Sequence, residues 1–128
     1  MRLGLVPDNP EEREALASIR VPVPFFETHY AFGLARTVMA ATKLGVFESL
    51  DRQAETVTEI ANRCRTDPEA TQKLLTALAG SGYVYVHNGQ YALTPMARHC
   101  LLAGTPDSLV DTVLFAFDEW DLMDHLED

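Results

Sequence analysis

The segment from Phe25 to Lys43 places the tightest constraint on how this chain of 128 residues can fold. On a helical wheel of 3.6 residues per turn, its large apolar side chains surround the axis instead of forming one stripe. They are Phe25, Phe26, Tyr30, Phe32, Leu34, Val38, Met39 and Ala41. A helix that is apolar nearly all round must be buried on nearly all sides.

A chain of this length is about one ordinary domain, which cannot easily enclose a helix of some five turns at its centre. Burial against a second subunit solves the problem. We therefore predict a homodimer whose interface includes Phe32, Leu34, Val38 and Ala41. The alternative is a central helix that its own domain wraps.

The same segment approaches the length that spans a bilayer, about 20 residues. It carries Glu27, His29, Arg36 and Lys43, so we expect no membrane span. The composition is that of a globular domain, with 47% hydrophobic and 23% charged residues. No signal peptide is recognisable, and the two cysteines, at 64 and 100, lack metal-site spacing, so we expect a reducing cytoplasm.

The net charge of −9 is concentrated at one end of the chain. No Lys or Arg occurs from Asp107 onward, and the preceding residues are close to neutral overall. The acids of this segment are Asp107, Asp111, Asp118, Glu119, Asp121, Asp124, Glu127 and Asp128. A solvated helix face is the expected explanation, and a specific basic partner is the alternative. Neither half of the chain offers the basic face that binds nucleic acid.

Several helices are predicted from their capping residues. A short first helix follows Asn9 and Pro10, with Ala15, Leu16 and Ile19 as its apolar face. Thr56 and Glu59 form a capping box for a helix to about Arg63. Further helices follow Asp67 and Thr94, each with proline at the first position. Glycines are expected to end two helices, at Gly45 and at Gly80-Ser81-Gly82.

A β-hairpin is predicted between the last two of these helices. Tyr83–His87 and Gln90–Leu93 are strand-like, and Asn88-Gly89 between them favours a tight turn. Three helices followed by a hairpin make a helix-turn-helix with a wing. The predicted fold is therefore mainly α: a winged helix with extra N-terminal helices for dimerisation and a long C-terminal connecting helix.

The last helix is predicted to begin at Thr105-Pro106-Asp107 and to continue to the end of the chain without a C-cap. It carries two apolar stripes, which implies two packing partners. One consists of Leu109, Val110, Val113, Leu114, Phe117 and Trp120, and the other of Phe115, Leu122 and Leu126. We expect three parts: an arm at 1–24, a dimerisation and winged-helix domain at 25–104, and a connecting helix at 105–128.

This arrangement resembles the N-terminal region of class I SAM-dependent O-methyltransferases that act on aromatic and polyketide small molecules. The matching segments are Ala35–Leu50, Val57–Ala61, Asp67–Tyr83, Tyr91–Ala97 and Asp118-Glu119-Trp120. The resemblance implies homodimers formed through the N-terminal helices and a C-terminal Rossmann-type domain that binds S-adenosylmethionine. It also implies natural product biosynthesis, with a small aromatic acceptor.

No catalytic, cofactor-binding or metal-binding residue is predicted within residues 1–128. A cofactor domain of this type needs a glycine-rich turn after a strand, whereas Gly80-Ser81-Gly82 follows a helix and precedes a strand. The resemblance suggests one further role, a wall of the partner subunit's acceptor pocket. The candidate wall residues are Phe25, Phe26, His29, Tyr30 and Met39, for which simple interface packing is the alternative.

Two other functions remain open at the level of sequence. A winged helix could belong to a DNA-binding regulator, but the expected recognition helix, 68–79, has no net positive charge. The turn of the wing, His87-Asn88-Gly89-Gln90, contains no Lys or Arg. The second alternative is a free-standing dimeric interaction module derived from the methyltransferase fold.

Overall fold

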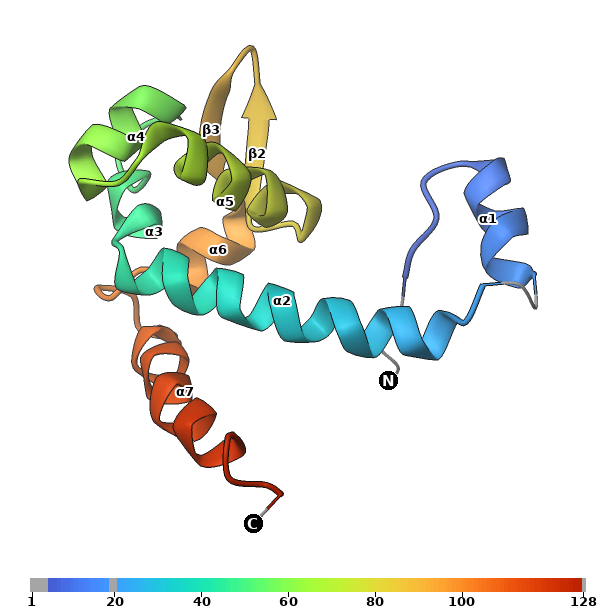
Figure 1. Cartoon of the computed structure of the whole chain (residues 1–128). Coiled ribbons are helices and arrows are strands. Elements are labelled where there is room, and N and C mark those ends of the chain that lie inside the picture. The colour runs from blue at the N-terminus through green and yellow to red at the C-terminus, as the bar shows by residue number, and fades with distance from the viewer. Residues whose placement is uncertain (1–4, 19–20, 128) are drawn as a thin grey trace. The chain divides into compact units, whose positions relative to one another are not determined.

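A computed structural model describes residues 5–18 and 21–127, and Figure 1 shows its elements. The chain forms two compact units, Met1–Ala35 and Arg36–Asp128. The boundary falls inside the long helix α2 (Val23–Lys43), which contributes its beginning to the first unit and its end to the second. The predicted boundary between residues 24 and 25 lies before this division and stays a prediction.

The first unit contains helix α1 (Pro10–Ala17) and the part of α2 up to Ala35. Asn9 caps α1 as predicted, because its side-chain oxygen accepts a hydrogen bond from the Glu12 amide at 2.8 Å. The Glu12 carboxylate in turn accepts from the Asp8 amide at 2.8 Å. No residue of α1 is buried, and Ile19, assigned to its apolar face, lies outside the described residues.

The second unit is mainly helical with a small antiparallel sheet, as predicted. Its helices are the end of α2, α3 (Val46–Ser49), α4 (Val57–Cys64), α5 (Pro68–Gly80), α6 (Pro95–Cys100) and α7 (Val110–Met123). Its strands are β1 (Glu55–Thr56), β2 (Val84–His87) and β3 (Gln90–Leu93), in the order β1-β3-β2. The sequence did not predict β1, which pairs Glu55 with Tyr91 over a strand of only two residues.

Local sequence signals explain where these elements begin and end. The capping box of α4 is present, with reciprocal bonds between Thr56 and Glu59. The bonds from the Thr56 amide and hydroxyl to the Glu59 carboxylate hold the pKa of that carboxyl below its usual value. At the end of α5, Gly82 has a φ of +79°, and the Tyr83 amide donates to the Leu78 carbonyl at 2.9 Å. This closure ends the helix at the predicted glycines.

The turn between β2 and β3 also follows the prediction. Asn88 and Gly89 have φ values of +51° and +76°, the left-handed pair that a two-residue type I′ turn requires. The register of the hairpin, with Val84 opposite Leu93 and His87 opposite Gln90, places Val84, Tyr91 and Leu93 in the core.

The hydrophobic core lies in the second unit and is drawn from its helices and its sheet. The members that are fully enclosed include Phe47, Leu50, Ile60, Leu75 and Leu78. They come from α3, α4, α5 and the residue after α3, so each short helix buries one face against the others. The core therefore forms without any contribution from the first unit.

The last helix differs from its prediction at both ends. It begins at Val110 instead of Thr105, and Leu109 precedes it without a side-chain cap. Turn hydrogen bonds occupy the intervening residues, and the Leu109 amide donates to the Cys100 carbonyl at 2.7 Å, which ties this point to α6. The helix ends at Met123 and turns follow through residue 127, so the expectation of a helix continuing to the chain end was wrong; Asp128 lies outside the described residues.

Candidate functional site

The beginning of α2 presents large apolar side chains to solvent. Phe25 is 61% exposed, Tyr30 52%, Phe32 64% and Leu34 39%. We call these four residues the α2 apolar surface. By contrast, Met39 is 3% exposed and Ala41 is fully buried in the second unit. The alternative of a helix wrapped by its own domain therefore describes only the end of α2.

Four rings at the start of α2 form a connected group, which we call the ring array: Phe25, Phe26, His29 and Tyr30. Phe25 stacks on His29 with centroids 5.7 Å apart and planes 9° apart, and Phe26 stacks on Tyr30 at 5.9 Å and 17°. Edge-on contacts at 5.7 and 6.0 Å join the two stacks. The spacing of four residues places each stacked pair on one helix face.

The structure thus brings together four of the five candidate wall residues. The fifth, Met39, lies in the second unit, where its own chain covers it. Among the candidate interface residues, Phe32 and Leu34 belong to the α2 apolar surface. Val38 is half-buried and packs against the core of its own unit. Val38 and the buried Ala41 therefore have little surface left for a second chain.

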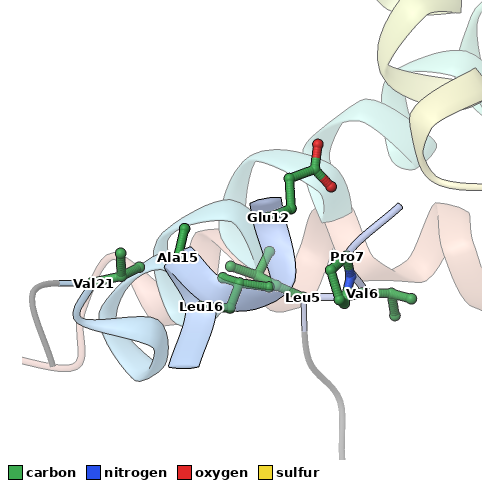
Figure 2. A pocket seen from close by; sticks show the side chains of 7 residues that line it. All are labelled: Leu5, Val6, Pro7, Glu12, Ala15, Leu16 and Val21. Atoms are coloured by element: carbon green, nitrogen blue, oxygen red, sulfur yellow. The ribbon is translucent and has the colours of Figure 1, made fainter. Parts of the chain in front are cut away.

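An open hollow of about 260 Å³ lies beside α1 in the first unit, and no pattern in the sequence predicted it. Figure 2 shows its lining, which is apolar except for one carboxylate: Leu5, Val6, Pro7, Glu12, Ala15, Leu16 and Val21. The Leu5 amide also donates to the Glu27 carboxylate of α2 at 3.2 Å, which ties the segment before α1 to the helix.

The end of α2 contacts α7 through cations placed over aromatic rings. The guanidinium of Arg36 lies 4.9 Å from the Phe117 ring centroid and 5.0 Å from that of Trp120. The ammonium of Lys43 lies 4.6 Å from the Phe117 ring. Together with Val113, which packs on the core, these contacts engage the first predicted stripe of α7. The second stripe remains exposed, with Phe115, Leu122 and Leu126 among the most accessible apolar residues described.

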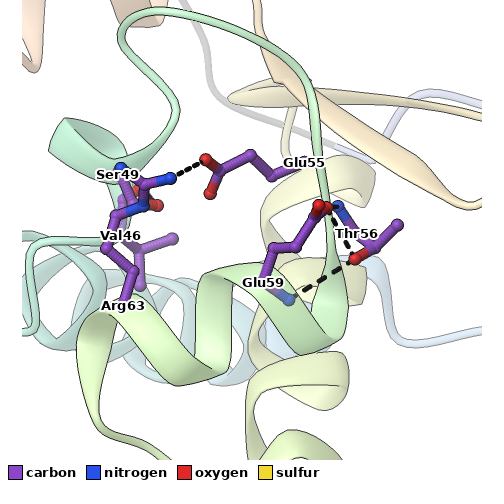
Figure 3. A network of polar contacts seen from close by, with 6 residues as sticks. All are labelled: Val46, Ser49, Glu55, Thr56, Glu59 and Arg63. Carbon is purple, nitrogen blue, oxygen red and sulfur yellow. Dashed lines mark hydrogen bonds and ion pairs between the residues drawn. The ribbon is translucent and has the colours of Figure 1, made fainter.

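A buried carboxylate lies between α3, β1 and α4, and Figure 3 shows its surroundings. The Glu55 side chain is almost fully buried and forms an ion pair with Arg63, whose side chain is half-exposed. The second carboxylate oxygen of Glu55 is buried without a hydrogen-bond partner. Burial raises the pKa of the nearby Cys64 thiol, and the charge of Glu55 adds to that rise. This network holds elements of the core together.

The exposed side of α5 offers little to a nucleic acid. Its one cation, Lys73, pairs with Glu69 at 2.7 Å, and Gln72 donates to the Tyr91 hydroxyl at 2.7 Å. A helix that reads the major groove needs such side chains free for bases and phosphates. The geometry of α5 therefore gives no support to the DNA-binding alternative.

Two observations on the described residues bear on cofactor and metal binding. Gly82 uses its positive φ to close α5. The segment Gly80-Ser81-Gly82 therefore does not form the turn from a strand into a helix that could hold a nucleotide. Across residues 5–18 and 21–127, no three His, Cys, Asp or Glu side chains come together as metal ligands. Over the same residues, no helix combines the length and apolarity needed to cross a bilayer.

Comparison with known proteins decides the family. Residues 26–103 match the family described as the O-methyltransferase dimerisation domain. The chain belongs to this family. The matched range includes all of α2 from its second phenylalanine, the helical core and the hairpin, so the family is defined by the same elements that the structure arranges.

Individual relatives agree with this assignment. The chain is 34% identical over 86 residues to a 3-hydroxy-5-methyl-1-naphthoate 3-O-methyltransferase of Streptomyces sahachiroi, covering 66% of this chain and 25% of the relative. A structure of PigF with SAH matches with a TM-score of 0.76 and 26% identity, over 81% of this chain and 35% of that one. CalO1, a methyltransferase in calicheamicin biosynthesis, matches in its SAH-bound form with a TM-score of 0.67 and 26% identity, over 87% and 31%. The chain thus spans about a quarter to a third of the length of these relatives.

Proposed function

We propose that this chain is the dimerising and acceptor-pocket-shaping part of a SAM-dependent O-methyltransferase that modifies a small aromatic or polyketide-like molecule in natural product biosynthesis. The observation that carries the proposal is the α2 apolar surface, which lies within or next to the matched dimerisation domain. An exposed group of large apolar side chains on a helix marks a surface that another molecule covers. In a dimerisation domain, that molecule is a second copy of the chain.

Phe32 and Leu34 are the residues we assign to the subunit interface. Val38 and Ala41, also predicted at the interface, pack in the core of their own unit and are assigned the role of fixing the end of the same helix. S-adenosylmethionine belongs to the full-length enzyme in this proposal, because the neighbours described with SAH are chains about three times as long as the matched part. Both cysteines are free thiols, in keeping with a cytoplasmic protein.

The ring array is proposed to form a wall of the partner subunit's acceptor pocket. Its flat, stacked rings suit a planar aromatic acceptor of the naphthoate kind that the Streptomyces relative is named for. A hydroxynaphthoate is the probe for this role, with binding to the dimer followed by NMR. Tyr30→Leu should weaken that binding several-fold. Equal binding by the wild type and this variant would contradict the proposal that the ring array lines the pocket.

Sedimentation of the 14.2 kDa chain tests the dimer directly. The wild type should sediment at twice that mass, and Phe32→Asp should raise the dimer dissociation constant by at least about 30-fold, since a central apolar contact is worth about 2 kcal/mol. Leu122→Asp is the matched control, because Leu122 is a large apolar residue of α7 that is 71% exposed. A monomeric wild type, or a larger effect of the control, would reject the proposed interface.

A further inference from the structure

The middle of α2 is open to solvent on every side. The nine consecutive residues from Thr28 to Arg36 are all exposed. They span about two and a half turns of helix, so the described part of the chain covers no face of this segment. Phe32 and Leu34, assigned above to the subunit interface, lie at its centre, and the dimerisation-domain match includes all of it. A second chain can therefore reach the helix here from any direction.

A glycine, Gly33, occupies the position between these two apolar residues. A helix interior disfavours glycine relative to alanine, because glycine loses more backbone freedom on folding. A positive φ, or an atom in the space that a Cβ would fill, can require glycine despite this cost. Gly33 lies inside α2 without a positive φ. Among the described residues, no atom beyond its chain neighbours and its own helix backbone lies within 4 Å of an added Cβ. The single chain thus has room for a larger residue at this position.

Large side chains surround the space above Gly33. Phe32 and Leu34 lie on either side of it around the helix, and Tyr30 lies one turn before it on the same face. The exposed fractions of Phe32, Leu34 and Tyr30 are 64%, 39% and 52%. When two helices pack, a side chain of one lies between side chains of the other, and a glycine at that point lets the backbones approach more closely. The segment therefore has the shape that suits a second helix.

We propose that Gly33 is the point of closest approach between α2 and the α2 helix of a second copy of this chain, where its backbone receives Phe32 of the partner subunit; this inference rests on the proposed dimer. A two-fold interface brings the same surface of both chains together, so that surface must supply both the inserting side chain and the space for it. Phe32 and Gly33 supply the two side by side.

The charges of the segment do not oppose this contact. Between residues 28 and 36, Arg36 is the only Lys, Arg, Asp or Glu, and its guanidinium lies over the rings of α7. The acids that give the chain its charge of −9 lie elsewhere in the sequence. Two copies of this segment can therefore meet without placing like charges against each other.

Substitutions that fill the space above Gly33 distinguish close approach from simple apolar contact. Gly33→Ala adds one methyl group and Gly33→Leu adds a larger apolar group, and a two-fold interface contains each of them twice. If exposed apolar area alone drove association, both would tighten the dimer. Close approach predicts the opposite, because an added group in a packed contact forces the helices apart. We expect the dimer dissociation constant, measured by analytical ultracentrifugation, to rise at least about tenfold for Gly33→Ala and further for Gly33→Leu.

The helix itself should tolerate the smaller change. Gly33→Ala should show equal or greater helix content by far-UV circular dichroism, since alanine favours a helix and the single chain has room for it. Gly80→Ala is the matched control. Gly80 is the exposed last residue of α5 with the same open space around an added Cβ, so this variant should keep the wild-type dissociation constant.

Three results would overturn this inference while leaving the proposed dimer intact. They are an affinity that is unchanged or higher in Gly33→Ala, an equal loss of affinity in Gly80→Ala, and a loss of affinity that accompanies a loss of helix content. A wild-type chain that is monomeric would instead reject the proposed function, and this inference with it.

Discussion

The beginning of α2 and the core of the second unit are both rich in large apolar side chains, but they have opposite surroundings. Phe47 is enclosed by helices of its own chain, whereas Phe25 and Phe32 are mostly exposed. The hydrophobic effect requires that both sets be covered and does not specify by what. A helix that is apolar on all sides therefore predicts that all its sides are covered. Only the structure distinguishes the residues that the same chain covers from those left for another molecule.

The largest difference between the two regions should appear in the stability of the single chain. Phe47→Ala removes a fully buried ring and should lower the free energy of unfolding by about 3–5 kcal/mol. Phe25→Ala removes an exposed ring and should change it by less than about 1 kcal/mol. Urea denaturation at chain concentrations below the dimer dissociation constant measures both. Equal losses would mean that the first part of α2 is packed within its own chain.

An intermediate loss of stability is expected at the buried ion pair of the second unit. Arg63→Met leaves the buried Glu55 carboxylate without its cation and should cost about 1–3 kcal/mol. Adding Glu55→Gln should restore most of that loss, because the uncompensated charge is then gone. Glu27→Gln in the first unit, where the carboxylate accepts one amide hydrogen bond, should change stability by about 0.5 kcal/mol or less. Denaturation of the three variants tests this order, and no recovery in the double variant would contradict it.

A smaller loss than that of Arg63→Met is expected at the contact between α2 and α7. Arg36→Gln removes the guanidinium that lies over Phe117 and Trp120 and should cost about 1 kcal/mol. Trp120 is the only tryptophan in the chain, so its emission reports directly on this contact. We expect a red shift and a lower anisotropy in Arg36→Gln and neither change in Arg52→Gln, which removes a cation elsewhere. An unchanged spectrum in both would show that apolar contacts alone hold α7.

The parts of the fold that the sequence predicted are those encoded within a few residues. Asn9, Thr56, Asp67 and Thr94 each cap the helix that follows, because a side-chain oxygen reaches an amide three residues on. The turn at Asn88-Gly89 is equally local. At the end of α7, by contrast, the absence of a stop signal suggested a longer helix, and the helix nevertheless ends at Met123.

The features that the sequence could not predict depend on contacts between distant residues. Strand β1 exists only because Glu55 and Thr56 lie beside β3, and two residues carry no periodic signal of their own. The position of Arg36 over Phe117 joins residues far apart in the chain. The delayed start of α7 follows from a bond between Leu109 and Cys100. For the candidate site, the sequence named the four residues that the structure joins in the ring array. It did not show that Met39, a candidate wall residue, and Ala41, a candidate interface residue, are covered by the core of the second unit.

The outer side of α7 combines exposed apolar side chains with the carboxylates that give the chain its acidity. Phe115, Leu122 and Met123 are more than half exposed, and the exposed acids Asp118, Glu119 and Asp121 lie between Phe115 and Leu122 in the sequence. At neutral pH these carboxylates repel neighbouring molecules and so keep the chain soluble despite its exposed apolar side chains. Near the isoelectric point of about 4.7 that electrostatic barrier disappears while the apolar groups remain. The solubility of the chain should therefore pass through a sharp minimum near that pH, with α7 as the surface through which the molecules precipitate.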